Sequence, residues 1–488
     1  MSALNEIRAE RLKKLAILQK AGVNPYPAVT KRTHTISDAV ASFEALSTSN
    51  ENVILVGRVL VVRGQGAILF IDIQDGTGKF QVVFKEDEID AEKFSLFNDV
   101  VDAGDFIEVK GNLFVTQKGQ PSILAKDWTM LTKSLLPLPD KFHGLQNEEE
   151  RLRKRYLDIL THPELKEMFI RKEKFWDVTR NFMKSQGFME VETPTLEVTT
   201  GGAEARPFKT HHNDFDIDVF LRISVGELWQ KRLLASGFEK VFEIGRTYRN
   251  EGSSPNHLQE FTNLELYQAF ANYEDGMKFV TELYRTIAQS VYGKTSFTRG
   301  EYSFDLADEW KQIDYREEVK RQTGVDVLTT TKDEIKTRLQ ELKVVYEGDN
   351  KERLMDTLWK YCRKNIAGPS FLVNHPLLVS PLAKKIEGEP EGFNRTQRFQ
   401  PIIAGAEVGN GYSELNDPLD QQARFDLQHA LLQAGDEEAM MSDNEFIEML
   451  EHGIPPAFGF GFGERLFAIF EDRPIRETQL FPLMRPKE

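Results

Sequence analysis

The sequence predicts an α+β protein in which a small β-barrel is followed by a longer part that combines helices with antiparallel strands. Two observations support this prediction. Several short, β-branched stretches of alternating polarity lie within residues 53–135, as is typical of a small barrel. Further along, residues 242–267 contain two apolar strand patterns on either side of a run of turn formers. That arrangement indicates an antiparallel hairpin with a long loop.

The composition is that of an ordinary globular protein with more than one domain. The chain has 488 residues, 40% hydrophobic and 28% charged, which is enough for two or three domains. No apolar run approaches the roughly 20 residues of a membrane span, and the N-terminus lacks the apolar segment of a signal peptide. The single cysteine, Cys362, excludes an intrachain disulfide and a cysteine metal cluster. We therefore expect a cytoplasmic protein with no membrane partner and with Cys362 in a core.

The net charge of −15 argues against nonspecific adhesion to nucleic acid, although a local basic face is enough for a specific contact. Residues 1–50 are expected to form a basic N-terminal helix and a connection. A weak apolar stripe at helical spacing (Leu4, Ile7, Leu15 and Leu18) accompanies the basic residues. The segment fits either a solvated terminal helix or part of a nucleic-acid surface. Its basic side chains are Arg8, Arg11, Lys13, Lys14, Lys20, Lys31 and Arg32.

Residues 51–135 are expected to form a five-stranded barrel of the OB type, followed by a Pro-containing linker at 136–150. The clearest strand patterns are VILVGRVLVV (53–62), ILFIDIQ (68–74), FQVVF (80–84) and FIEVKG (106–111). The sequence DGTG (75–78) is a strong hairpin turn. OB barrels bind single-stranded nucleic acid by stacking bases on aromatic side chains beside basic groups. The barrel is therefore a candidate nucleic-acid-binding domain.

The hairpin around residues 242–267 brings chemically useful side chains onto one surface. Arg249, Glu251, His257 and Phe261 flank or follow the turn-rich loop. An arginine fork suits a phosphate, because its planar donors meet two oxygens at once, and an aromatic ring suits a purine face. A solvated hairpin with surface ion pairs would have a similar composition. Composition alone leaves both interpretations open.

The order of residues resolves that choice through resemblance to a known family. Residues 248–262, with Arg249, the loop, His257 and Phe261, resemble the second signature motif of class II aminoacyl-tRNA synthetases. The following ELY (265–267) resembles the bacterial lysyl-tRNA synthetases. Residues 165–200, expected to form a long helix that ends at Gly187 and then a strand over 188–196, resemble the first motif, and residues 459–472 resemble the third. Residues 272–300 are expected to form a helix. The resemblance implies that residues 151–488 form a class II catalytic domain, an antiparallel sheet flanked by helices, and that the protein is a homodimer. The charged helical segment at 314–366 is assigned no chemistry.

The resemblance also implies a ligase that activates L-lysine with ATP and then transfers lysine to the terminal ribose of tRNA(Lys). Arg249 would hold the α-phosphate, Glu251 the adenine amino group and His257 the γ-phosphate, while Phe261 and Arg465 would sandwich the adenine. Mg²⁺ is the implied cofactor, with Glu407 and Gln400 as its ligands. The implied ATP-binding residues are Arg249, Glu251, His257, Phe261, Glu407 and Arg465, of which Arg249 and Arg465 are catalytic.

Two further sets of residues follow from the same resemblance. Glu414 is decisive for the amino acid, because a partly buried carboxylate needs a cation and the lysine ε-ammonium supplies one. The implied lysine-binding residues are Gly202, Glu227, Glu265, Tyr267, Asn410 and Glu414. Arg63, Phe70 and Gln81 match the positions that read the anticodon, although Phe70 taken alone favours a core position.

The chain departs from the family pattern at three places. Val225 and Gly226 precede Glu227 where the family commonly has a single Pro. Gln400 stands where a carboxylate is usual, and an amide oxygen brings less charge to Mg²⁺. The run HLQEF (257–261) is closer to asparaginyl and archaeal aspartyl enzymes. Two alternatives therefore accompany the lysyl interpretation: an asparaginyl- or aspartyl-type synthetase, and a non-catalytic, tRNA-binding paralogue.

Overall fold

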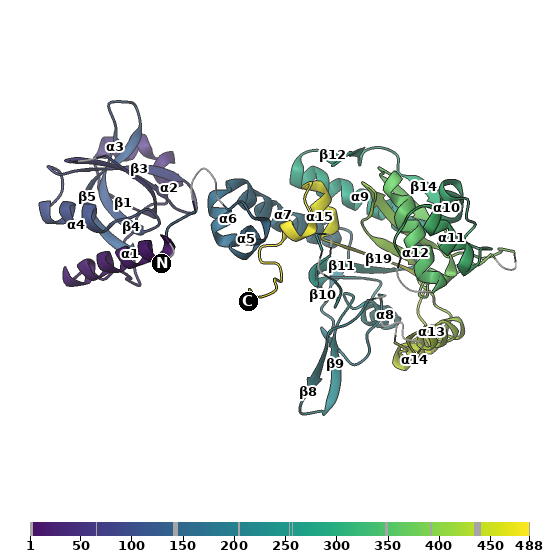
Figure 1. Ribbon diagram of the computed structural model, residues 1–488. Coiled ribbons are helices and arrows are strands. Elements are labelled where there is room, and N and C mark those ends of the chain that lie inside the picture. The colour runs from purple at the N-terminus through teal and green to yellow at the C-terminus, as the bar shows by residue number, and fades with distance from the viewer. Residues whose placement is uncertain are drawn as a thin grey trace. The chain divides into compact units, whose positions relative to one another are not determined.

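The computed structural model consists of two compact units, residues 1–148 and 149–488, each described here by itself (Figure 1). Among the described residues, no helix is long and apolar enough to cross a membrane. Residues 140–144 of the expected linker lie outside the described part. The structure describes residues 3–64, 66–139, 145–203, 205–252, 254–255, 257–346, 350–390, 393–433 and 441–487.

The N-terminal unit is built on a closed five-stranded barrel, as predicted. Its strands follow the order β1-β2-β3-β5-β4, and all neighbours are antiparallel except β3 and β5. Alternate residues of β1, such as Val53, Leu55 and Val59, are fully buried, which explains the period-two pattern of the sequence. The strands are β1 (Val53–Arg63), β2 (Ile68–Gln74), β3 (Lys79–Lys85), β4 (Phe106–Val115) and β5 (Pro121–Thr132).

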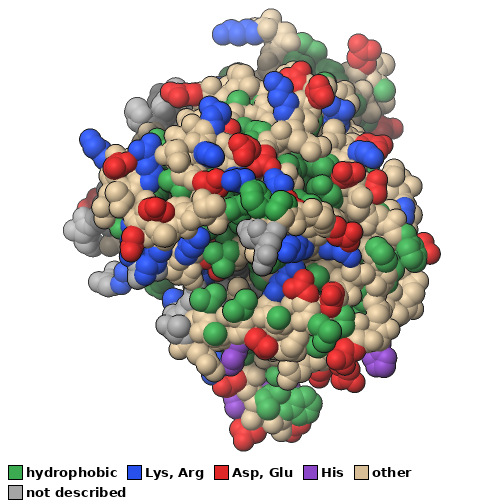
Figure 2. All heavy atoms as spheres, turned by 90° about the vertical axis from the view of Figure 1, so that its right-hand side faces the viewer, with side chains coloured by type: hydrophobic (Ala, Val, Ile, Leu, Met, Phe, Trp, Pro, Cys, Tyr) green, Lys and Arg blue, Asp and Glu red, His purple; other side chains and the backbone are tan. Residues whose placement is uncertain are grey.

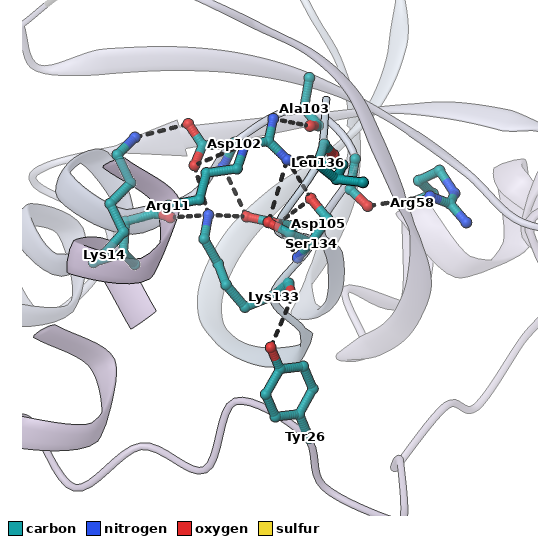
Figure 3. Close-up of polar contacts among 12 residues, drawn as sticks. Arg11, Lys14, Tyr26, Arg58, Asp102, Ala103, Asp105, Lys133, Ser134 and Leu136 are labelled. Atoms are coloured by element: carbon teal, nitrogen blue, oxygen red, sulfur yellow. Dashed lines mark hydrogen bonds and ion pairs between the residues drawn. The ribbon is translucent and has the colours of Figure 1, made fainter. Parts of the chain in front are cut away.

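A buried ionic cluster attaches helix α1 (Ala3–Lys20) to this barrel (Figure 3). Lys133 is 1% exposed, and its Nζ lies 2.8 Å from Asp105 Oδ2 and 2.6 Å from Asp102 Oδ2. Arg11 of α1 donates to the Ser134 hydroxyl at 2.6 Å, and Lys14 pairs with Asp102 at 2.7 Å. Removing one partner from such a cluster leaves a buried charge uncompensated, so the cluster fixes the helix in place.

Two of the seven basic side chains in the N-terminal segment therefore have a structural role. Arg11 and Lys14 are engaged with the barrel and are not free to contact nucleic acid, whereas the other five basic side chains of the segment are exposed. The expected apolar stripe is also only partly used. Leu18 is fully buried, but Leu4 and Ile7 are 53% and 38% exposed.

The second unit is organised around a nine-stranded, mostly antiparallel sheet. Its order is β14-β15-β16-β18-β19-β11-β10-β6, with β17 beside β16. The predicted hairpin is formed by β10 and β11, paired antiparallel from Lys240 with Gln268 to Tyr248 with Glu260. The strands are β6 (Met189–Glu190), β10 (Lys240–Tyr248), β11 (Glu260–Ala269), β14 (Lys311–Asp314), β15 (Ser370–Val373), β16 (Arg398–Ile403), β17 (Ala406–Glu407), β18 (Asn410–Ser413) and β19 (Ala457–Gly463).

Helices α7 (Pro163–Ser185) and α9 (Tyr273–Tyr292) contribute to one large core together with the sheet. Strand β19 reads AFGFGFG, and its alternation separates two faces. Phe458, Phe460 and Phe462 are at most 2% exposed and belong to the core shared with these helices. The intervening glycines therefore lie on the opposite face of the strand. That face is the floor of the site described below.

Three expectations about local structure need correction. The helix expected over 272–300 ends at Tyr292, because Gly293 has φ 68° and the chain continues as β12 (Ser296–Arg299). The strand expected over 188–196 is limited to the two residues of β6 and to β7 (Leu196–Glu197). The segment at 314–366 is helical, as expected, but it reaches the active site through Trp359 and Arg363, as shown below.

The second unit also contains a group of three helices with a core of its own. Helices α10, α11 and α12 share a core of their own that contains Cys362, fully buried as expected.

Figure 2 shows basic and acidic side chains interspersed on one face of the molecule. The other elements are α2 (Ile36–Ala41), α3 (Phe43–Ser49), α4 (Ala91–Val100), α5 (Glu148–Arg153), α6 (Arg155–Thr161), β8 (Lys209–His212), β9 (Ile217–Leu221), α8 (Glu227–Ala235), β13 (Tyr302–Asp305), α10 (Tyr315–Thr323), α11 (Lys332–Glu341), α12 (Lys351–Cys362), α13 (Pro418–Gln433), α14 (Asn444–His452) and α15 (Arg465–Phe470).

Candidate active site

A pocket of about 260 Å³ opens on the glycine face of β19. The neighbouring strand β11 contributes Asn263, Glu265 and Tyr267, which alternate with the core residues Leu264 and Leu266. The pocket brings together every residue predicted for the ligand sites of this unit. These are Gly202, Glu227, Arg249, Glu251, His257, Phe261, Glu265, Tyr267, Gln400, Glu407, Asn410, Glu414 and Arg465.

One end of the pocket holds carboxylates around a buried ammonium group. Glu227 and Lys231 lie one turn apart on α8, so their side chains point the same way, and Lys231 Nζ is 2.8 Å from Glu227 Oε1. The same Nζ is 2.6 Å from Glu414 Oε2. Tyr412 donates its hydroxyl to Glu227. Lys231 is only 2% exposed, so this ion pair is built into the free protein.

Glu414 retains an unused oxygen. Its side chain is 2% exposed, and no described residue donates a hydrogen bond to Oε1. A Cβ atom on Gly459 would lie 2.3 Å from that oxygen and 2.5 Å from Tyr267 Cε1. The glycine therefore lets the carboxylate and the tyrosine ring pack close to the strand backbone, and these three residues line one part of the pocket, called the slot here. When Glu414 is ionised, this buried oxygen requires a donor, because an isolated carboxylate oxygen is costly to bury.

The unusual residues before Glu227 are accommodated by the fold. Gly226 has φ 67°, and a Cβ there would lie 2.0 Å from Thr193 Oγ1, so only glycine fits. Glu265 Oε1 accepts from the Val225 N–H at 2.8 Å. Glu227 consequently enters the pocket beside Gly202, where a Cβ would lie 2.8 Å from Glu227 Oε2. The extra residue therefore leaves Glu227 in the pocket.

Burial changes the acidity of this region. It raises the pKa of Glu414 to about 8, although Lys231 opposes the shift. Burial and the charge of Glu227 likewise raise the pKa of Glu265 to about 7. Both causes disfavour the charged form of a carboxyl group. In the free protein this end of the pocket therefore retains protons near neutral pH, and an incoming cation would displace them.

The opposite end of the pocket is cationic and aromatic. The Arg249 guanidinium carbon lies 5.3 Å from the centre of the Phe261 ring, and Arg249 Nε donates to the Ile223 carbonyl at 3.3 Å. Arg465, the first residue of α15, donates to the Glu407 carbonyl at 3.1 Å. His257 Nδ1 lies 2.7 Å from the Ser254 hydroxyl. This end offers fixed donors to a polyphosphate and an aromatic face to a base.

One oxygen of each predicted magnesium ligand already contacts a protein donor. Glu407 Oε1 accepts from Trp359 Nε1 at 2.8 Å and pairs with Arg363 at 2.9 Å. Gln400 Oε1 lies 3.0 Å from His375 Nε2. Among the residues that the structure describes, no group of three or more His, Cys, Asp or Glu side chains could hold a metal ion. Magnesium is usually held by one or two carboxylates together with waters and substrate phosphates, and this pair offers one neutral amide and one carboxylate that already faces an arginine.

In the separate N-terminal unit, the predicted anticodon residues share one face of the barrel. Arg63 pairs across the ladder with Phe70, and Asp72 pairs with Gln81, so their side chains lie on the same side. Phe70 is half-buried between the core residues Leu69 and Ile71. The alternative of a core position for Phe70 is therefore wrong. Arg63 is held by Asp72 at 2.7 Å, and Gln81 Oε1 accepts from a serine hydroxyl at 2.9 Å.

Sequence reasoning missed four residues around the pocket: Lys231, Tyr412, Trp359 and Arg363. Two of them had a detectable signal. Lys231 follows Glu227 at the i, i+4 spacing of a helix, and Tyr412 lies between Asn410 and Glu414 at the period of a strand. Trp359 and Arg363 had none, because they come from the helical segment that was assigned no chemistry.

Comparison with known proteins agrees with this geometry. Residues 147–485 match the family described as tRNA synthetases class II (D, K and N). Residues 53–131 match the family described as OB-fold nucleic acid binding domain. A match of this extent defines the class of protein as a class II tRNA synthetase with an appended OB barrel.

Curated relatives narrow the class further. The chain is 42% identical over 491 residues to a lysine–tRNA ligase of Roseiflexus sp. (strain RS-1), covering 99% of this chain and 100% of the relative. It is 41% identical over 493 residues to the lysine–tRNA ligase of Moorella thermoacetica, covering 100% of this chain and 99% of that protein. The lysine–tRNA ligase of Thermotoga maritima is 39% identical over 491 residues, covering 99% of this chain and 97% of that protein. The chain belongs to this family of lysine–tRNA ligases.

Proposed function

We propose that this protein activates L-lysine with ATP to lysyl-adenylate and pyrophosphate, and then transfers lysine to the terminal ribose of tRNA(Lys). One observation carries the choice of amino acid: the unsatisfied Oε1 of buried Glu414 at the end of the slot beside Gly459. An ε-ammonium group at the end of an unbranched alkyl chain would supply the missing donor. Full-length relatives that are lysine–tRNA ligases support the same choice over asparagine or aspartate.

The charges of the pocket favour an amino acid with two ammonium groups. Among the described residues, Lys231 is the cation that pairs with both Glu227 and Glu414, whereas Glu265 lies within the influence of Arg249 and Arg222. The lysine ε-ammonium would meet Glu414, and its α-ammonium would meet Glu227 beside Gly202. A neutral side chain would leave Glu414 with an unpaired oxygen. Breaking a buried ion pair costs about 3–5 kcal/mol, which corresponds to a discrimination of about 10²–10³-fold.

The chemistry needs no covalent enzyme intermediate. A carboxylate oxygen of lysine attacks the α-phosphorus of ATP, the bond to the β-phosphate breaks, and pyrophosphate leaves. Arg249 would hold the α-phosphate and stabilise its developing charge, which is the electrostatic role expected in phosphoryl transfer. A ribose hydroxyl of tRNA then attacks the activated carbonyl, and AMP leaves. Positioning and charge stabilisation are sufficient for both steps.

The other side chains of the pocket would position the substrates. Phe261 and Arg465 would enclose the adenine by stacking and cation–π attraction, worth about 0.5–2 kcal/mol. Glu251 would accept from the adenine amino group, and His257 would meet the γ-phosphate. Asn410 receives a hydrogen bond from Arg398 at 2.8 Å on its Oδ1, so its amide N–H groups are the ones left to donate to the substrate.

The direct test of this function is amino-acid-dependent ATP–pyrophosphate exchange, run over all standard amino acids. Lysine alone should support exchange, because only its side chain satisfies both the slot and Glu414. Exchange with asparagine or aspartate would replace the proposed substrate. Exchange with none of them would favour a tRNA-binding paralogue without catalysis.

Lysine binding should be coupled to the loss of protons. Because the pKa values of Glu414 and Glu265 are raised to about 8 and about 7, lysine must displace protons at lower pH. The affinity should therefore rise by about tenfold or more between pH 6 and pH 8.5 and then level off. Calorimetric titration in buffers of different ionisation enthalpy measures both the affinity and the protons released. A lysine Kd that is constant over this range would contradict the proposed protonation.

The barrel should act in tRNA charging and not in amino-acid activation. Replacing Phe70 by Ala removes a stacking platform worth about 1–3 kcal/mol per base, so kcat/KM for tRNA should fall about 5- to 150-fold. Lysine-dependent exchange should stay unchanged, since it needs no tRNA. Val115→Ala, which also alters an exposed apolar residue of the barrel (54% exposed), is the matched control. Equal loss of charging in both variants would remove Phe70 from the tRNA surface.

We also propose that the protein works as a homodimer in the cytoplasm. The resemblance of residues 165–200 to the first class II motif supports the dimer, since that motif forms a two-fold interface in the family. Sedimentation at enzyme concentrations used for assay would test it. The cytoplasmic location follows from the substrate, because tRNA charging supplies the ribosome. Magnesium is proposed to accompany ATP, in the manner argued next.

A further inference from the structure

We propose that the guanidinium of Arg363 balances the charge of Glu407 in place of a protein-held divalent cation, so that a metal ion reaches this site only as a complex with the nucleotide. The inference rests on the proposed function only in taking ATP as the substrate. It concerns the free protein, and it can be tested without any amino acid.

Two protein side chains contact one oxygen of the Glu407 carboxylate. Arg363, in the turn that follows α12, pairs with Glu407 Oε1 at 2.9 Å, and Trp359 of α12 donates to the same oxygen at 2.8 Å. A divalent cation bound through this oxygen would have to displace both donors and lie next to a fixed positive charge. At such distances like charges repel strongly in a partly buried site.

Gln400, the second expected metal ligand, is a poor ligand for a different reason. Gln400 carries no charge, and its amide oxygen lies 3.0 Å from Nε2 of His375, which is 2% exposed. Since an amide oxygen can only accept, the imidazole Nε2–H is the donor. A cation bound by the same oxygen would have to share it with the imidazole N–H or displace that N–H, which would then be buried without a partner. Displacement would cost the desolvation of that group.

The surrounding charges favour an anion over a free cation. Arg465 donates to the Glu407 carbonyl at 3.1 Å, and Arg398 donates to Asn410 at 2.8 Å nearby on the sheet. Together with Arg363, they place three guanidinium groups around one carboxylate. Such a site attracts a polyphosphate with its own metal ion and repels the bare ion.

Binding of Mn²⁺ to the nucleotide-free protein, followed by electron paramagnetic resonance, tests this proposal. The wild-type protein should show no Mn²⁺ bound at Glu407. The double variant Arg363→Gln/Gln400→Glu removes one positive charge and adds one carboxylate. It should bind Mn²⁺ at least about tenfold more tightly, because ligand charge sets the affinity of such sites. Arg363→Lys, which keeps the charge, should behave like the wild type.

Two results would overturn the proposal. The first is tight Mn²⁺ binding by the wild-type protein that is lost in Glu407→Gln. The second is a double variant that is folded, as judged by near-ultraviolet circular dichroism, but gains no affinity. If the double variant does not fold, the wild-type and Glu407→Gln titrations still decide the matter. Lysine-dependent exchange is measured separately, so a failure of this proposal and a failure of the proposed function are distinguishable.

Discussion

Replacing Glu414 by Gln is expected to lower kcat/KM for lysine in ATP–pyrophosphate exchange by about 10²–10³-fold, with KM for ATP unchanged. The substitution preserves the shape of the side chain but removes the charge that faces the slot beside Gly459. It also removes one of the two carboxylates that hold Lys231. The lysine ε-ammonium would then enter a buried site that already contains the Lys231 ammonium group and has lost one of its two carboxylates.

Steady-state exchange at varied lysine and at varied ATP separates the two effects. Glu282→Gln removes the same charge from an exposed position on α9 and should leave both parameters as in the wild type. If Glu414→Gln used lysine as well as the control does, Glu414 would have no part in selecting the substrate.

The second large effect is expected at the phosphate end of the pocket. Arg249→Ala removes both the fork that would hold the α-phosphate and the cation over Phe261. Loss of one preorganised donor to a developing charge typically costs about 10²–10³-fold in rate. We therefore expect kcat for lysine-dependent exchange to fall by at least this factor. The affinity for lysine alone, measured by calorimetry, should change far less.

Two further variants serve as comparisons in this experiment. Arg249→Lys retains the charge but not the planar fork, so it should recover only part of the lost rate. Arg321→Ala removes an arginine from the surface of α10, where its side chain is 67% exposed, and should have no effect. An Arg249→Ala enzyme with the exchange rate of the Arg321→Ala control would contradict the assigned role.

The parts of the site that the sequence predicts correctly are those fixed by local periodicity and motif order. Strand alternation places Glu265 and Tyr267 on one face of β11. The same rule places Asn410 and Glu414 together on β18 and just after it. These residues gather in the pocket because β11, β19 and β18 are neighbours in the sheet.

The contacts that sequence reasoning missed depend on tertiary structure. Lys231 reaches Glu414 only because the left-handed Gly226 sets the direction of α8. Arg363 and Trp359 reach Glu407 only because the helical segment packs beside β16 and β17. The helix expected to extend to residue 300 ends at Tyr292, because Gly293 terminates α9 in a left-handed conformation.

The most direct measurement is a crystal structure of the protein with lysine and a non-hydrolysable ATP analogue. The account predicts that the lysine Nζ lies within hydrogen-bond distance of Glu414 Oε1, in the slot between that carboxylate and the Tyr267 ring. Lys231 should remain on Oε2, and the α-ammonium should meet Glu227. A lysine side chain bound elsewhere, with Glu414 contacted by Lys231 alone, would contradict the central claim about how this pocket selects its amino acid.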